Sequence, residues 1–238
     1  MKIEGRNAVL EAVKSGKTID RVMVRNGMRD EASRSLTSAI KSAGIKVHFV
    51  DKITIDNESV TGKHQGFIAF VTDYRYAEIE DIIKNPKSGS PFIVVLDGVE
   101  DPHNLGSVIR VCECAGADGL IIGKHRSAAV TETVMRISEG SANHLKIARV
   151  GNINAAVEFL KKNGVWVYAV ELGGEDIYKT DLTGPLALVI GGEDTGVNRL
   201  TLEKCDKTVT IPMMGKVNSL NASVAAGVAV FEGVRQRR

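Results

Sequence analysis

The chain has 238 residues, of which 43% are hydrophobic and 25% charged, and its 31 basic against 29 acidic residues leave a formal net charge of +2. A chain of this length can bury a core that needs no disulfide or metal to fold, and its three cysteines, an odd number, argue against a secreted disulfide framework. The first residues form no apolar signal segment and no stretch reaches the roughly 18 apolar residues of a membrane span, so we expect a cytoplasmic protein without a membrane partner.

The first third of the chain alternates short helices and strands. The pattern predicts helices over 6–13 and 32–43 and strands over 22–24, 47–50 and 67–71. Residues 1–73 carry 12 basic and 9 acidic side chains, which makes this part the better candidate for contact with a polyanion. A plain solvated surface explains the same charges equally well. Residues 74–90 are rich in Pro, Gly, Ser and Asn, which is typical of a linker.

A second pattern begins at residue 91 and continues to the end of the chain. Strands over 92–96, 119–122, 165–170, 186–190 and 209–211 alternate with helices over 105–115, 154–162 and 221–235. Runs such as 92–96 are apolar throughout, so both faces of these strands must be buried. We therefore expect an α/β fold with a parallel sheet flanked by helices over 91–238, joined by the linker 74–90 to a small α/β domain over 1–73.

The common nucleotide and metal motifs are absent from the sequence. None of the four Gly-Lys pairs has the glycine five residues earlier that a Walker A loop needs, and no G-x-G-x-x-G follows a predicted strand. The histidines show no metal-ligand spacing. Cys112 and Cys114 lie about 200° apart around a predicted helix, which favours structural thiols over ligands. We expect no metal.

Three polar segments follow or precede the predicted strands. In the first, 97–110, Asn104 is expected at a helix N-cap, and capping alone would explain it. Arg110 lies on an otherwise apolar helix face, where an arginine either extends to solvent or meets an anion. In the second, 188–197, Gly191 and Gly192 permit a sharp turn and close approach to a ligand, and Glu193 can act only as an acceptor or ion partner.

The third polar segment, 211–223, leads into the last predicted helix. Ser219 and Asn221 open this helix, which is apolar on nearly every side. Such a helix is either a capped core helix or one that meets another subunit. Three polar loops at strand ends of one sheet also resemble the place where α/β proteins bind ligands.

The three segments resemble the motifs of a known family. N-L-G-S-V-I-R at 104–110, G-G-E-D-T-G at 191–196 and I-P-M-M-G-K-V-N-S-L-N-A-S at 211–223 are similar to those of the SpoU-type, or SPOUT-class, RNA ribose 2′-O-methyltransferases. G-R-N-A-V at 5–9 and H-Q-G at 64–66 resemble the small substrate-binding domain of the bacterial 23S rRNA (guanosine-2′-O)-methyltransferases. One departure is Asp194-Thr195, where relatives often carry a small residue, and it bears on target choice.

The resemblance implies a carboxy-terminal trefoil knot, an S-adenosyl-L-methionine site inside it, and a homodimer. The catalytic residues it implies are Asn104, Arg110, Glu193, Ser219 and Asn221. The implied cofactor-binding residues are Gly191, Gly192, Ile211, Met213 and Leu220. The implied RNA-binding residues, all in the first domain, are Arg6, Asn7, Lys63, His64 and Gln65.

The function that follows from the resemblance is methyl transfer to the ribose 2′-hydroxyl of a guanosine in 23S rRNA, the RNA of the large ribosomal subunit. A tRNA ribose methyltransferase and a catalytically silent RNA-binding or ribosome-assembly protein are the alternatives. The role of Arg110 is also open. It either helps remove the 2′-hydroxyl proton or, since an arginine rarely gives up its own proton, anchors an RNA phosphate while another group accepts that proton.

Overall fold

The computed structural model describes residues 1–15, 17–87, 89–193, 195–216 and 219–238. The chain divides into two compact units, the first made of Met1–Arg75 with Val130–Glu132 and the second of Tyr76–Ala129 with Thr133–Arg238. Asp194 of the second motif, and the two residues between Lys216 and Ser219 of the third, lie outside the described residues.

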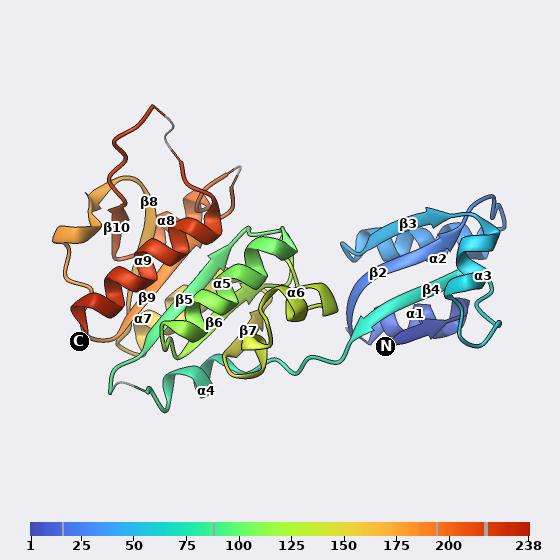
Figure 1. Cartoon of the computed structure of the whole chain (residues 1–238), viewed down its shortest axis with the longest axis horizontal. Helices are drawn as coiled ribbons and strands as arrows, with labels where there is room; N and C mark the ends of the chain where they lie inside the picture. The colour runs from blue at the N-terminus through green and yellow to red at the C-terminus, as the bar shows by residue number, and fades with distance from the viewer. Residues whose placement is uncertain (16, 88, 194, 217–218) are drawn as a thin grey trace. The chain divides into compact units, whose positions relative to one another are not determined.

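The first unit contains a four-stranded mixed sheet in the order β1-β4-β2-β3 (Figure 1). Its strands are β1 (Lys2–Glu4), β2 (Thr18–Arg25), β3 (Lys46–Val50) and β4 (Phe67–Thr72). β4 is antiparallel to both β1 and β2, and β3 is parallel to β2. The helices are α1 (Arg6–Lys14), α2 (Glu31–Ser42) and α3 (Lys52–Glu58).

Both faces of this sheet are covered. Val9 of α1 and Ile40 of α2 are fully buried in the larger apolar cluster, whereas Ile55 of α3 packs against Ile68 and Phe70 on the other face. The predicted helices and strands of this part are confirmed. β1 and α3 were not predicted, because β1 has a single apolar residue between Lys2 and Glu4 and the seven residues of α3 are too few to show a helical period.

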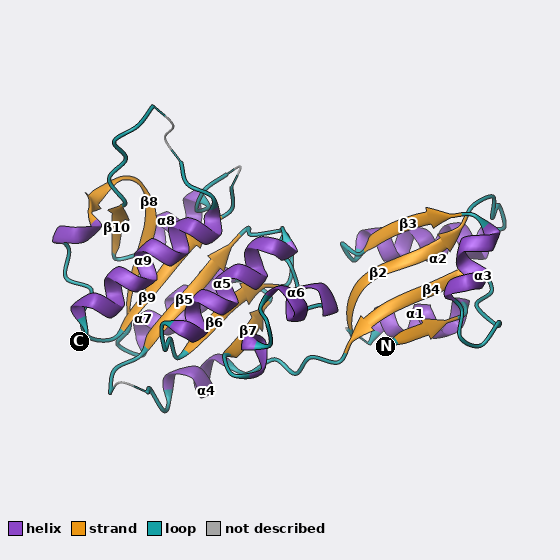
Figure 2. Ribbon diagram, viewed as in Figure 1, coloured by secondary structure: helices purple, strands orange, loops and turns teal. Residues whose placement is uncertain are grey.

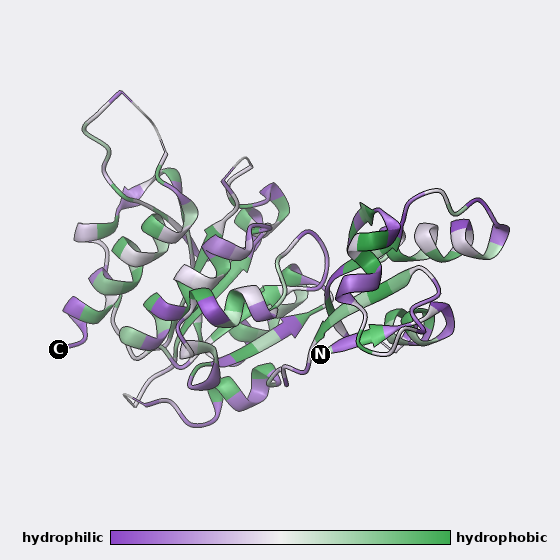
Figure 3. Cartoon of the chain, turned by 45° about the vertical axis from the view of Figure 1, so that its right-hand side comes forward, coloured by the Kyte–Doolittle hydropathy of each residue, from purple (hydrophilic) through white to green (hydrophobic). Residues whose placement is uncertain are grey.

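The second unit contains a six-stranded parallel sheet in the order β10-β8-β9-β5-β6-β7 (Figure 2). The strands are β5 (Phe92–Asp97), β6 (Gly119–Gly123), β7 (Lys146–Val150), β8 (Trp166–Asp176), β9 (Leu186–Gly191) and β10 (Lys207–Thr210). The inner strands are hydrophobic along most of their length (Figure 3), as strands buried on both faces must be. The predicted parallel α/β fold is confirmed.

Helices cover both faces of this sheet. On one face, α9 (Ala222–Gln236) crosses β5 so closely that a Cβ atom on Gly233 would lie 2.7 Å from the Phe92 ring, and α9 also packs on α5 (Pro102–Cys114). On the other face, Ile82, Leu160 and Leu202 share one apolar cluster. They come from α4 (Ile79–Ile83), α7 (Ile153–Lys162) and α8 (Arg199–Lys204), and α6 (Glu132–Ile137) follows β6 along the chain.

The expected cap of α5 is wrong. Asp101, not Asn104, is the N-cap, and its carboxylate accepts a hydrogen bond of 3.0 Å from the amide of His103. Pro102 follows as the first helical residue, where no amide hydrogen is needed. The Asp-Pro pair therefore starts the helix earlier than the sequence analysis expected, and it places Asn104 inside the first turn, 6% exposed.

Residues 74–90, expected to be a linker, contain α4 and a contact with the larger sheet. The amide of Ala77 donates to the carbonyl of Ile147 at 2.8 Å, and Ile82 is fully buried. A Cβ atom on Gly119 would lie 2.6 Å from Ile82, so glycine is needed for this packing. None of the helices in the described ranges combines the length and apolar content that crossing a membrane requires.

Candidate functional site

The loop after β9 folds back on itself and on the end of β5. The amide of Gly192 donates to the carbonyl of Asp97 at 3.0 Å, and the amide of Gly196 donates to the carbonyl of Gly192 at 2.9 Å. A Cβ atom on Gly191 would overlap the backbone of Gly196 and Val197, and one on Gly192 would overlap Gly98. Both predicted glycines are therefore required by the shape of the loop.

Two carboxylates that the sequence analysis did not select hold the same loop. Glu171 Oε2 accepts from the amide of Val197 at 2.9 Å, and Asp97 Oδ2 accepts from the amide of Asn198 at 3.0 Å. Asp97 ends β5 and Glu171 follows the predicted strand over 165–170. The signal that could have identified them is their position, Asp97 directly after the predicted strand over 92–96 and Glu171 directly after the predicted strand over 165–170.

A cavity of about 160 Å³ lies beside this loop, at the carboxyl end of β9 and beside residues 170–172, where the pairing of β8 with β9 ends. Its walls come from three segments that are far apart in the sequence, including the second and third motifs. It contains all five residues expected to bind a cofactor and two of the residues expected to be catalytic. The lining residues are Val170, Glu171, Leu172, Ile190, Gly191, Gly192, Glu193, Gly196, Ile211, Met213, Ser219, Leu220, Ala222 and Ala225.

Asn221 connects all three motifs at the edge of this cavity. It is the N-cap of α9, where its Oδ1 atom accepts from the amides of Ser223, at 2.9 Å, and Val224. Its Nδ2 group donates to Asn104 Oδ1 at 3.0 Å and to Glu193 Oε1. Because the helix amides occupy the oxygen of the side-chain amide, the nitrogen must face Asn104 and Glu193.

Arg110 lies outside this network in the single chain. Its side chain is 51% exposed and forms an ion pair of 2.7 Å with Glu139. Val108 and Ile109 beside it are fully buried, so Arg110 occupies the exposed stripe of α5 rather than the apolar face that the sequence analysis expected. The apolar neighbours in the sequence belong to the buried side of the same helix.

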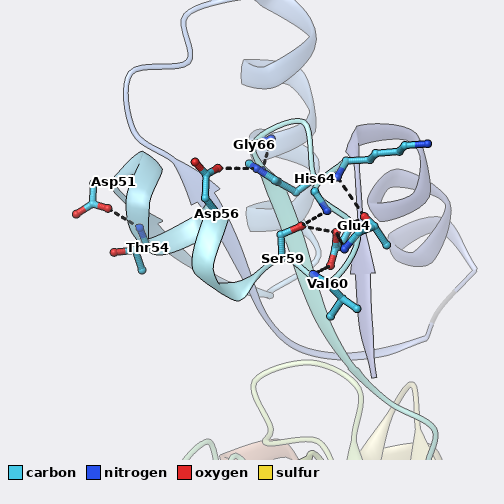
Figure 4. Close-up of polar contacts among 11 residues, drawn as sticks. Glu4, Asp51, Thr54, Asp56, Ser59, Val60, His64 and Gly66 are labelled. Atoms are coloured by element: carbon cyan, nitrogen blue, oxygen red, sulfur yellow. Dashed lines mark hydrogen bonds and ion pairs between the residues drawn. The ribbon is translucent and has the colours of Figure 1, made fainter.

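In the first unit, a carboxylate holds the loop that contains the predicted RNA-binding residues (Figure 4). Glu4 accepts hydrogen bonds from Ser59 Oγ at 2.7 Å, from the amide of Val60 at 2.6 Å, and from the amide and hydroxyl of Thr61. Burial by itself would raise the pKa of Glu4, but these hydrogen bonds outweigh it and lower the pKa from 4.5 to about 2.

The five predicted RNA-binding residues occupy neighbouring positions, but three of them are engaged within the unit. His64 Nδ1 accepts from the amide of Gly66 at 3.0 Å, so the proton lies on Nε2, which contacts Asp56 Oδ1 at 2.9 Å. Gln65 Oε1 accepts from the amide of Arg6 at 3.1 Å.

The guanidinium of Arg6 forms two hydrogen bonds with the carboxylate of Asp30, at 2.8 and 3.2 Å. The other two predicted residues, Asn7 and Lys63, are exposed. They are therefore the two whose side chains face solvent most freely, while the engaged residues fix the loop that carries Lys63.

Two family models match the chain. The model of the SpoU rRNA Methylase family matches residues 91–231, and the model described as RNA 2′-O ribose methyltransferase substrate binding matches residues 2–77. A Bacillus subtilis protein, YacO, whose name places it in the TrmH family of tRNA/rRNA methyltransferases, is 42% identical over 237 residues, covering 98% of this chain and 94% of its own length.

Solved structures are similar to the whole chain. The AdoMet-bound rRNA methyltransferase from Sinorhizobium meliloti has 25% identity and a TM-score of 0.62, with 98% of this chain and 86% of that chain covered. The SpoU methyltransferase AviRb from Streptomyces viridochromogenes, solved in complex with AdoMet, has 24% identity and a TM-score of 0.65, with 100% and 90% covered. At 24% identity, the similarity to AviRb shows a shared fold only.

Proposed function

The chain belongs to the SpoU family of RNA methyltransferases, and from this we propose that it transfers a methyl group from S-adenosyl-L-methionine to the ribose 2′-hydroxyl of a guanosine in 23S rRNA. The observation that carries the proposal is the junction at Asn221. One side chain there joins Asn104 of the first motif to Glu193 of the second, at the edge of a cavity lined by the second and third.

The cavity residues fit S-adenosyl-L-methionine. Leu172, Ile190, Ile211, Met213 and Leu220 give apolar walls suited to the adenine ring, and the predicted glycines leave backbone groups accessible for its polar edges. Glu193 offers a carboxylate on the same wall. When bound, the cofactor supplies an electrophilic methyl group on a positively charged sulfur, and a carboxylate on the wall favours the binding of such a charge.

The residues of this chain must then place a weak nucleophile and remove its proton. A ribose 2′-hydroxyl reacts only when it is held in line with the methyl group. Asn104 and Asn221 form a fixed amide pair suited to orienting the ribose or Glu193, and Ser219 lies on the cavity wall. Among the described residues of a single chain, no arginine forms a hydrogen bond or ion pair with Asn104, Asn221 or Glu193.

The catalytic set that the resemblance implies includes an arginine, and we assign this position to Arg110 of a second copy. Arg110 is exposed on α5 beside Val111, and α5 packs against α9, whose Val224 and Phe231 are 50% and 47% exposed. A homodimer that covers this side of α9 would bring the exposed stripe of α5 close to the partner's cavity. Arg110 then binds the RNA phosphate or assists removal of the proton.

The first unit provides the second half of the proposal, the recognition of RNA. The range 2–77, which matches the substrate-binding model, contains Asn7 and Lys63, and both residues are exposed. Lys63 suits a backbone phosphate and Asn7 a base or ribose. Ribosomal RNA as substrate also supports a cytoplasmic location.

The test of the proposed function is methyl transfer from tritiated S-adenosyl-L-methionine to total rRNA and, separately, total tRNA. We expect label in the 23S rRNA only. Label in tRNA alone would replace the rRNA target with the tRNA alternative. No label in either RNA, with S-adenosylhomocysteine still bound by the protein, would favour the silent RNA-binding alternative.

A further inference from the structure

Strand β8 pairs with its neighbour β10 in two separate stretches (Figure 1). Residues 168–169 pair with 207–208, and residues 175–176 pair with 209–210. The ladder therefore skips residues 170–174, which form a bulge on β8. A bulge bends its strand and redirects side chains, and bulges are over-represented next to active sites.

The bulge forms one wall of the cavity assigned to the cofactor. Residues 170–172 line the cavity from this side. Two glycines let the backbone fold tightly against β10. Gly173 has a positive φ of 78°, and a Cβ atom on Gly174 would lie 2.4 Å from the carbonyl oxygen of Thr208. The position of this wall therefore depends on how the bulge is held against β10.

A single hydroxyl group ties the bulge to β10. Thr210 Oγ1 donates to the carbonyl of Glu171 at 2.5 Å and accepts from the amide of Gly174 at 2.8 Å. A hydroxyl has one hydrogen, so the donor of Thr210 is already used by the backbone of the bulge. Thr210 is the last residue of β10 and directly precedes Ile211, where the third motif begins and where the chain lines the cavity again.

The side chain of Glu171 extends this connection to the second motif. Its Oε1 atom accepts from the amide of Leu172 at 3.0 Å, and its Oε2 atom accepts from the amide of Val197 at 2.9 Å. A Cβ atom on Gly196 would overlap the same carboxylate, so the carboxylate and the loop after β9 are in close contact. The bulge, this loop and the start of the third motif are therefore joined through Thr210 and Glu171.

We propose that Thr210 is a positioning residue for S-adenosyl-L-methionine and that it acts through Glu171 and the bulge 170–174. Asn221 joins the motifs at the edge of the cavity, whereas Thr210 sets the distance between the wall formed by the bulge and the wall formed by the loop after β9. A ligand binds more tightly to walls that are already in place, so loss of the hydroxyl lowers the affinity for the cofactor. The inference rests on the proposed function, because it takes this cavity as the cofactor site.

Substitutions at Thr210 separate the hydroxyl group from the shape of the side chain. Valine has the branched shape of threonine but can neither donate nor accept a hydrogen bond, whereas serine keeps the hydroxyl. Titration calorimetry of the full-length protein with S-adenosylhomocysteine provides the measurement. We expect Thr210→Val to weaken binding about tenfold, as the loss of one or two hydrogen bonds would, and Thr210→Ser to bind within about twofold of the native protein.

The matched control is Thr208→Val, which makes the same change on the same strand. The side chain of Thr208 forms no hydrogen bond with another residue in the part of the chain that the structure describes. This variant should bind S-adenosylhomocysteine as the native protein does. Native affinity in Thr210→Val, or an equal loss in Thr208→Val and Thr210→Val, would overturn the inference.

Glu171→Gln tests whether Thr210 acts through Glu171. Glutamine has one acceptor oxygen where the carboxylate has two, so it cannot accept from both amides in the same way. We expect about tenfold weaker binding from this change alone, and at most about twofold more in the double variant with Thr210→Val, since both changes release the same wall. Losses that multiply to about a hundredfold would show that Thr210 acts independently of Glu171. Should Thr210→Val fail to fold, native affinity in Glu171→Gln would by itself overturn the inference.

Turnover separates positioning of the cofactor from general damage to the site. In Thr210→Val the loss should appear in KM for S-adenosyl-L-methionine, while kcat and the KM for RNA change by less than about twofold. A fall in kcat as large as the rise in KM would contradict a role in cofactor positioning. Calorimetry does not require turnover, so a protein that methylates no RNA but shows the expected affinities would refute the proposed function and leave this inference standing.

Discussion

The side-chain amide of Asn221 serves two purposes through its two polar atoms. Its oxygen caps α9, and its nitrogen joins Asn104 to Glu193. The two purposes can be separated by substitution. Aspartate keeps the capping oxygen, and its charge is favourable at a helix N-terminus, but it has no N–H group and would place a second carboxylate beside Glu193.

We therefore predict that Asn221→Asp lowers methyl transfer by about 100-fold, a barrier change of roughly 3 kcal/mol, with little change in melting temperature. Asn221→Ala should lower activity similarly and also cost about 1 kcal/mol of stability through the lost cap. Activity assays and thermal unfolding of both variants provide the measurement. If Asn221→Asp retains full activity, the junction has no catalytic function.

Arg110 gives a second prediction about a single residue. Arg110→Ala should reduce methyl transfer by about 100-fold or more while S-adenosylhomocysteine binding, measured by calorimetry, stays the same. Loss of the exposed pair with Glu139 should hardly affect stability. Arg199→Ala is the matched control, since Arg199 is also exposed and paired, with Glu203 at 3.1 Å. Equal activity of the two variants would remove Arg110 from the catalytic set.

At the scale of the elements, the loop between α3 and β4 depends on the ionisation of Glu4. Because folding lowers the pKa of Glu4, its carboxylate stabilises the native state at pH values above 4.5, and this contribution declines as the pH falls toward about 2. A glutamine at this position can accept fewer and weaker hydrogen bonds than the carboxylate.

We predict that Glu4→Gln unfolds at lower denaturant concentration than the native protein at pH 7, and that the difference shrinks between pH 4.5 and about 2. Glu11→Gln, which changes an exposed carboxylate 3.5 Å from Lys14, is the control and should show no such trend. A difference between Glu4→Gln and the native protein that stays constant across this pH range would show that the carboxylate charge is not what holds the loop.

The elements that the sequence predicted are those with long apolar runs. The strand over 92–96 was predicted because every residue is apolar, and the structure buries all five. β7 was missed because it lies at the sheet edge, where Lys146 and Arg149 interrupt the apolar pattern. β8 extends six residues beyond its predicted end. It resumes pairing with β10 after a shift in register between Thr208 and Val209, which depends on tertiary contacts.

The candidate site was predictable only in part. Motif residues such as Asn104 and Glu193 were selected by type and position, and the structure brings them together through Asn221. The anchoring of the loop by Glu171 depends on β8 and β9 being neighbours, which a single strand cannot reveal. The threading of a trefoil knot stays a prediction.

At the scale of the whole molecule, α9 presents apolar residues on two sides. Ala226, Ala229 and Val230 face the sheet and are fully buried, whereas Val224 and Phe231 are about half exposed, at 50% and 47%. Exposed apolar side chains on one helix are typical of a subunit interface. A stable interface of this kind would bury more than about 1,000 Å² and be the same in both copies.

We predict that the native protein is a homodimer at micromolar concentration and that Phe231→Asp produces monomers with little activity but with S-adenosylhomocysteine binding retained. Equilibrium sedimentation gives the mass of each. Trp166→Asp is the control, because Trp166 is 57% exposed at a position away from α9 in the sequence. An active native monomer would refute the dimer and leave the methyltransferase assignment intact.

The first unit should contribute RNA affinity without affecting the cofactor. Lys63→Ala should weaken RNA binding and make the slope of log affinity against log salt less steep by about 0.7–0.9, the value for one phosphate contact. S-adenosylhomocysteine affinity should stay the same. Lys17→Ala, an exposed lysine of the same unit, is the control. An unchanged salt slope for Lys63→Ala would show that Lys63 does not contact phosphate.

The identity of the methylated product tests the central claim most directly. RNA labelled by the purified protein is separated into 23S rRNA, 16S rRNA and tRNA, digested to nucleosides and analysed by mass spectrometry, with the native protein compared against Asn221→Asp. The account predicts 2′-O-methylguanosine from 23S rRNA with the native protein and at least about 100-fold less with the variant. A methylated base, or 2′-O-methylation confined to tRNA or to a nucleoside other than guanosine, would contradict it.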